Sequence, residues 1–208
     1  MLPGRRTHLV VSAVLEETDR DRGTLATPRS PELAIVDELR IWGGERLLFV
    51  ECGDGLVAEE AWRRIAKGYV CGLDRSARLV ALATRLRGVP GKLEFKTWDG
   101  RCVPCPDGFF DAVVSWCDVR RWPKPVAVLR ELRRVVRSDG QVYLVEANGG
   151  VGPASRTSAW PQLLEQAGLL VHPRATWPGL GSTPDHGAGL RMLCARPANL
   201  LPLSACES

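Results

Sequence analysis

Short apolar runs and amphipathic stretches alternate along most of this chain. Residues 47–50 are fully apolar, as a strand buried on both faces should be, and largely apolar runs typical of strands occur at residues 69–74, 110–116 and 141–145. Stretches with helical spacing separate them. In the clearest of these, residues 124–137, apolar residues share one face and arginines cover the other. This alternation predicts an α/β protein with a parallel sheet.

The remaining elements are predicted from caps and from shorter patterns. Ser30 followed by a proline predicts the start of a helix, and Ser76 is a second good N-cap. Further helices are predicted at residues 56–67 and 159–167, and further strands at 92–97, 169–175 and 190–195. Residues 1–29 show little periodicity and are predicted to be a lid or disordered. The domain itself is predicted to span residues 30–197, with a tail at 198–208.

The composition limits the domain count, the partners and the metal content that we expect, but it does not indicate a function. The chain has 208 residues and a net charge of +4, which fits one soluble domain and gives no reason to expect nucleic acid as a partner. No apolar run reaches the roughly 20 residues of a membrane helix, so we expect a cytoplasmic protein without membrane contact. The seven cysteines are scattered, and the Cys102–Cys105 pair lacks the second pair that a zinc site needs, so we expect no metal.

The most informative local feature is a glycine turn directly after the first strand. Gly53 and Gly55 flank Asp54, and the second strand ends in Asp74 about twenty residues later. In doubly wound sheets such a turn lets backbone approach a nucleoside, and the acid accepts hydrogen bonds from ribose hydroxyls. Asp54 would place a negative charge beside a pyrophosphate. The turn therefore favours S-adenosylmethionine, which has no phosphate, over a dinucleotide.

Four blocks resemble the class I S-adenosylmethionine-dependent methyltransferases, closest to the type 11 small-molecule group. GERLLFVECGDG at residues 44–55 resembles the family's GERVLDVGCGTG, and GLDRS at 72–76 resembles GxDxS. PCPDGFFDAVVS at 104–115 resembles LPFPDGSFDVVVS, and LRELRRVVRSDG at 129–140 resembles LREIARVLRPGG. The resemblance implies a Rossmann-like doubly wound sheet of about seven mostly parallel strands, with the last strand antiparallel.

The resemblance also implies where the cofactor S-adenosyl-L-methionine would bind. Gly53 and Gly55 would lie under its methionine part, and Asp74 would hold the ribose. Asp99 would bond the adenine amino group, and the end of the fourth strand would approach the sulfonium and a small-molecule acceptor. The full set of expected cofactor-binding residues is Glu51, Cys52, Gly53, Gly55, Asp74, Arg75, Trp98, Asp99, Gly100, Ser115 and Trp116.

Two positions depart from the family pattern and keep other hypotheses open. Phe49 replaces the family's first acid, and Glu51 replaces its first glycine, although Glu51 could be the same acid displaced by two residues. A methyltransferase fold that lost catalysis and serves as a binding partner or scaffold is therefore the alternative. A nicotinamide-dependent oxidoreductase is a third, disfavoured by Asp54.

The catalytic residues, the acceptor and the oligomeric state cannot be predicted from the sequence. Asp118, Asp185 and His186 are polar groups in regions where an acceptor would bind, and none of them is singled out as a general base. Arg120 and Arg121 suit an acidic acceptor as well as a solvated loop.

Overall fold

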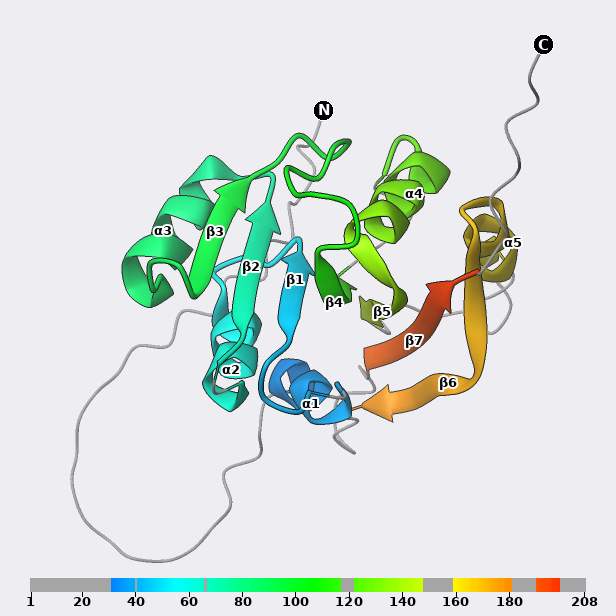
Figure 1. Cartoon of the computed structure of the whole chain (residues 1–208), viewed down its shortest axis with the longest axis horizontal. Helices are drawn as coiled ribbons and strands as arrows, with labels where there is room; N and C mark the ends of the chain where they lie inside the picture. The colour runs from blue at the N-terminus through cyan, green and yellow to red at the C-terminus, as the bar shows by residue number, and fades with distance from the viewer. Residues whose placement is uncertain are drawn as a thin grey trace, which may run out of the picture.

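Seven strands form one continuous sheet in the order β3-β2-β1-β4-β5-β7-β6 (Figure 1). The computed structural model describes residues 31–39, 41–65, 67–116, 122–147, 159–180 and 190–198. The strands are β1 Arg46–Val50, β2 Tyr69–Asp74, β3 Leu93–Thr97, β4 Phe110–Trp116, β5 Val136–Ala147, β6 Leu169–Leu180 and β7 Leu190–Pro197. β1 to β5 pair in parallel, whereas β7 is antiparallel to both of its neighbours. The predicted Rossmann-like sheet with an antiparallel last strand is confirmed.

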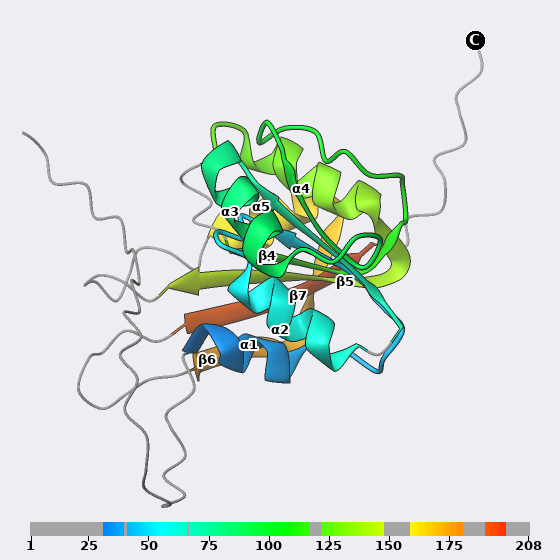
Figure 2. The same ribbon diagram turned by 90° about the vertical axis from the view of Figure 1, so that its left-hand side faces the viewer.

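Helices cover both faces of this sheet. They are α1 Pro31–Glu38, α2 Leu56–Arg64, α3 Ala77–Arg87, α4 Pro125–Val135 and α5 Ala159–Gln166. Apolar residues of α1, α2 and α3 share one buried cluster with the sheet, and those of α4 and α5 share the other. Figure 2 shows α1 and α2 below the sheet and α4 above it. The core is therefore two apolar layers separated by the sheet, as the two-sided apolar strands predict.

Local sequence features explain where α3 and α4 begin and how α4 is oriented, and the predicted cap at Ser76 is confirmed. The Ser76 side chain accepts a hydrogen bond from the Leu79 N–H at 3.4 Å and caps α3. Pro125 occupies the first turn of α4, where a missing N–H costs nothing. The apolar face of α4 is buried, and Arg133 and Arg134 lie in its last turn, where the helix dipole favours cations.

Two helices end earlier than their apolar periodicity predicts. The prediction of a helix through residue 137 is wrong, because Val136 is extended and pairs with Phe110 as the first residue of β5. The spacing of apolar residues cannot distinguish a helix from a strand at this position, since Val136 would be buried in either conformation. Likewise α2 ends at Arg64 instead of residue 67, because Ile65 is extended and the Lys67 N–H donates to the Gly43 carbonyl.

Several sequence predictions lie outside the described residues. These are the N-terminal segment 1–29, the arginine pair at 120–121, and the polar residues Asp118, Asp185 and His186. Within the described ranges, no helix combines the length and the apolar content that crossing a membrane requires. The same ranges contain no group of three or more His, Cys, Asp or Glu side chains placed to hold a metal ion.

Candidate functional site

The glycine turn joins β1 to α2 at the carboxyl edge of the sheet, toward which β2 and β3 point in Figure 1. Gly53 and Gly55 both have positive φ, 59° and 81°, which glycine adopts without steric cost. A side chain at Gly55 would lie 2.5 Å from the Phe95 ring, whereas one at Gly53 would meet nothing within 4 Å. The turn is thus packed tightly at Gly55 and open at Gly53.

Asp74 ties the turn to the end of β2. Its Oδ2 accepts a hydrogen bond from the Gly53 N–H at 2.9 Å, and its Oδ1 accepts one from the Ser76 N–H at 2.8 Å. The residue is only 9% exposed, so these bonds compensate the cost of burying a carboxylate. Each carboxylate oxygen can accept a second bond. The predicted ribose acid therefore lies directly beside the open glycine.

Glu51 is the residue in the turn that departs most from the family pattern, and it adopts a backbone conformation that favours glycine. Its φ is 58°, a left-handed conformation that costs a non-glycine residue about 1–2 kcal/mol. Its Oε1 lies 3.0 Å from Arg75 Nη2 and accepts a hydrogen bond from Trp122 Nε1 at 3.3 Å. Three segments of the chain therefore meet at one carboxylate beside the turn.

The surroundings of Cys52 and Asp54, the two other residues of the turn, determine how much charge each contributes to the site. Burial, together with the negative charges of Asp74 and Asp54, raises the pKa of the Cys52 thiol to about 12, so Cys52 is neutral at physiological pH. The Asp54 carboxylate pairs with Arg87 of α3 at 3.0 Å. Its charge is therefore partly compensated, which weakens the argument that Asp54 alone would repel a phosphate.

The loop after β3 carries the predicted adenine contacts. Asp99 Oδ1 accepts hydrogen bonds from the Arg101 and Cys102 N–H groups, and these bonds lower the pKa of this exposed carboxyl. Gly100 packs against Arg75, since a side chain at Gly100 would lie 3.2 Å from Arg75 Cδ. Farther along the loop, Arg134 of α4 donates to the carbonyls of Val103 and Cys105. The loop is therefore in contact with the residue that follows β2 and is hydrogen-bonded to α4.

Two buried polar atoms near this edge have no hydrogen-bond partner among the described residues. They are Ser115 Oγ, near the end of β4, and Trp98 Nε1, just after β3. Ser115 is fully buried and pairs in register with Val50, next to Glu51. A buried hydroxyl without a partner is costly, and a bound molecule or water is the usual explanation. Trp116 instead packs against the core on the α1 and α2 side.

A pair of cysteines behind the loop gives a prediction about reactivity. A hydrogen bond with buried Cys71 lowers the pKa of half-buried Cys105 to about 7, and nearby Lys96 and Arg134 favour the thiolate further. Thiolates are the reactive form. We expect iodoacetamide to label Cys105 with a rate that rises through pH 7, rather than near the 8.5 of an ordinary thiol.

Peptide mass spectrometry after timed labelling measures this rate. Cys71→Ala removes the hydrogen bond, so the rise should move to higher pH in that variant. Labelling of Cys105 that rises only above about pH 8.5 in the unmodified chain would contradict the assignment.

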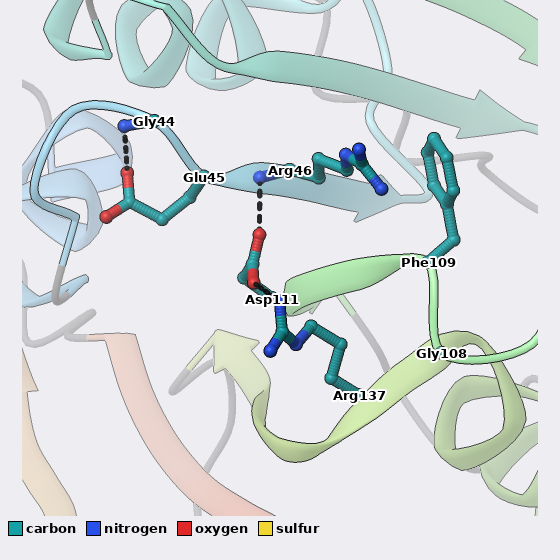
Figure 3. Close-up of a pocket in the computed structure, with 7 residues that line it drawn as sticks. All are labelled: Gly44, Glu45, Arg46, Gly108, Phe109, Asp111 and Arg137. Carbon is teal, nitrogen blue, oxygen red and sulfur yellow. Dashed lines mark hydrogen bonds and ion pairs between the residues drawn. The ribbon is translucent and has the colours of Figure 1, made fainter.

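A hollow of about 390 Å³ lies at the opposite, amino edge of β1 and β4 (Figure 3). Asp111 already has two partners there: its Oδ2 accepts the Arg46 backbone N–H at 2.8 Å, and its Oδ1 lies 3.3 Å from Arg137 Nη1. The Arg46 guanidinium lies over the Phe109 ring at 4.7 Å. None of the predicted cofactor-binding residues lines this hollow, so it is separate from the candidate site.

The structure brings most of the sequence-predicted residues to one edge of the sheet. Direct contacts connect Gly53 with Asp74, Glu51 with Arg75, and Arg75 with Gly100. The sequence analysis missed the bond from Trp122 to Glu51. No sequence signal could have found it, because 71 positions separate the two residues.

This arrangement of sheet, glycine turn and strand-end acid defines the chain as one with the class I S-adenosylmethionine-dependent methyltransferase fold. Comparison with known proteins then shows which family the chain is similar to. Residues 48–144 match the model of the type 11 methyltransferase family, described as a methyltransferase domain. This part of the chain is therefore similar to a methyltransferase domain, in agreement with the resemblance seen in the sequence, and the fold is that of SAM-dependent methyltransferases.

Curated relatives and solved structures agree with this similarity. A 2-phytyl-1,4-naphtoquinone methyltransferase of Synechococcus elongatus is 31% identical over 117 residues, which are 54% of this chain and 50% of the relative. A demethylmenaquinone methyltransferase of Lactobacillus johnsonii is 25% identical over 158 residues, 73% of this chain and 65% of the relative. The chain thus spans about half to two thirds of these relatives. A SAM-dependent methyltransferase from Aquifex aeolicus has the same fold, with a TM-score of 0.64 at 21% identity, covering 80% of this chain and 88% of the other.

Proposed function

We propose that this protein is a methyltransferase that uses S-adenosylmethionine to methylate a small-molecule acceptor by in-line transfer. The observation that carries the proposal is the open face of Gly53 beside the Asp74 carboxylate at the carboxyl ends of β1 and β2. Ligands of doubly wound sheets bind at this edge. The match of residues 48–144 to a methyltransferase domain then selects S-adenosylmethionine among nucleoside ligands.

The residues present fit this cofactor. Space above Gly53 admits the methionine part, and Asp74 retains acceptor capacity for ribose hydroxyls. The buried Ser115 hydroxyl and the Trp98 indole N–H need partners that no described residue supplies. Asp99 is exposed, and one of its oxygens accepts the N–H groups of the next turn, so its bond to an adenine amino group stays a prediction.

Methyl transfer needs alignment more than acid-base chemistry. The cofactor supplies a methyl group that its sulfonium already activates. The chain's own residues then have to hold the acceptor in line with that methyl group and exclude water. Cys52 takes no part as a nucleophile, because its pKa of about 12 keeps it protonated. A general base is dispensable where the acceptor is already nucleophilic.

Binding and turnover are tested separately. We expect calorimetry with S-adenosylhomocysteine, the demethylated product, to show one saturable site per chain. Transfer of labelled methyl groups is then screened over small acceptors, beginning with 2-phytyl-1,4-naphthoquinone and demethylmenaquinone, for which the two relatives are named. Absence of binding at about 1 mM ligand would contradict the proposal, since that is the weak end of ordinary substrate affinities.

One observation favours the second candidate, a methyltransferase-fold protein that does not catalyse. Phe49, at the position of the family's first acid, is fully buried in the core between the sheet and the helices α1 and α2. No polar group can reach the cofactor from there. Binding of S-adenosylhomocysteine without methyl transfer to any acceptor would support this candidate, and labelled product would exclude it.

A further inference from the structure

The carboxylate of Glu51 is held by charge and by hydrogen bonding at the edge where the nucleoside is proposed to bind. It is 14% exposed, lies 3.0 Å from the Arg75 guanidinium, and accepts the Trp122 N–H at 3.3 Å. A carboxylate this buried needs a cation or several hydrogen bonds to compensate its charge, and Glu51 has one cation and one hydrogen bond. The backbone at Glu51 is left-handed, a strained conformation of the kind that concentrates at ligand sites.

Arg75 is held less firmly than Glu51. Its side chain is 38% exposed, more than twice the 14% of Glu51. Its stem lies against Gly100, on the loop that carries the predicted adenine contacts. A guanidinium so exposed can leave the ion pair and return to water at little cost. The more buried Glu51 carboxylate would lose its compensating charge if no other cation took the place of Arg75. The pair is therefore suited to exchange its cation while the anion stays in place.

Resting on the proposed function, we infer that Glu51 is the receptor for the α-ammonium group of the cofactor's amino-acid tail, and that Arg75 occupies this receptor until the ammonium displaces it. Phe49 cannot perform this role, because it is apolar and fully buried in the core. Glu51 begins the turn that leads to the open face of Gly53, where the methionine part is proposed to lie. The Trp122 N–H keeps the carboxylate oriented during the exchange.

Two ligands separate this inference from the proposed function. S-adenosylhomocysteine carries the amino-acid tail, and 5′-methylthioadenosine has the same nucleoside without an α-ammonium group. Calorimetry measures the dissociation constants of both for the unmodified chain, Glu51→Gln and Arg75→Gln. Glu60→Gln is the matched control, because Glu60 is also a partly exposed glutamate paired with an arginine, at 2.8 Å from Arg64. Thermal unfolding verifies that each variant folds.

We expect Glu51→Gln to weaken S-adenosylhomocysteine about ten- to hundredfold and to leave methylthioadenosine within about twofold. Arg75→Gln removes the internal competitor. Because an exposed ion pair contributes little, it should tighten S-adenosylhomocysteine by at most about fivefold. Glu60→Gln should change neither ligand.

Other outcomes would contradict the inference or the proposed function, and the two cases can be told apart. Equal weakening of both ligands by Glu51→Gln, or no weakening of either, overturns the inference. Weakening of S-adenosylhomocysteine by Arg75→Gln overturns the exchange, since Arg75 would then be a ligand contact. If the unmodified chain binds neither ligand, the proposed function itself fails.

Discussion

Replacing Gly55 by alanine should lower the stability of the protein by about 2–5 kcal/mol. The added Cβ would lie 2.5 Å from the buried Phe95 ring and 3.2 Å from Ala83 Cβ, in a core that cannot expand freely. Overpacking of this kind costs about 1–3 kcal/mol, and the left-handed backbone adds about 1–2 kcal/mol. Unfolding by denaturant measures the loss, and the melting temperature should fall by roughly 4–20 °C.

Gly53→Ala is the matched control two residues away. It has a similar positive φ, but its Cβ would meet no atom within 4 Å, so only the cost of about 1–2 kcal/mol for the backbone remains. The Gly53 variant should therefore fold well and yet bind S-adenosylhomocysteine poorly, because its Cβ projects into the proposed ligand space. Equal stability of the two variants would show that Phe95 does not fix the turn.

Asp74→Asn should weaken S-adenosylhomocysteine about ten- to hundredfold and also destabilise the fold by about 1–3 kcal/mol. Both carboxylate oxygens accept backbone N–H groups, from Gly53 and Ser76, so an amide must direct its own NH₂ at one of these donors. The ligand then loses both an acceptor for its ribose and a well-ordered turn. Calorimetry and denaturant unfolding measure the two effects.

Asp111→Asn serves as the control for this change. Asp111 also accepts a backbone N–H of β1, from Arg46 at 2.8 Å, but it lies at the amino edge of the sheet. Its replacement should cost some stability and leave the affinity for S-adenosylhomocysteine unchanged. If both variants lose affinity to the same degree, the effect of Asp74→Asn comes from general destabilisation and the assigned site is wrong.

Predictions that rest on local pattern agree closely with the structure. The bounds of β2 and β4 agree with the predicted strands, and Ser76 caps α3, because these features depend on apolar runs and on one hydroxyl. The junction of α4 and β5 could not be predicted in the same way. Val136 is buried as a helix residue or as a strand residue, and only its pairing with Phe110 decides between them.

Within the candidate site, residue types were predictable and their partners were not. The glycine turn and Asp74 follow from the order of strand, turn and acid. The ion pairs of Asp54 with Arg87 and of Glu51 with Arg75 depend on how α3 and the end of β2 pack beside the turn. The two pairs differ in effect. The pair of Asp54 with Arg87 compensates the charge that was expected to repel a phosphate. The pair of Glu51 with Arg75 places a cation on Glu51, the residue that departs from the family pattern.

The Phe95 ring couples the substitutions that are tolerated at residues 55, 72 and 95. Side chains at Gly55 and at Gly72 would both come within about 2.5 Å of this one ring, so it fills the space of two missing side chains at once. A change at any of the three positions therefore alters which residues the other two tolerate. In an evolving lineage or a designed library, larger residues at positions 55 or 72 should arise together with a smaller residue at position 95, and single substitutions would misjudge all three.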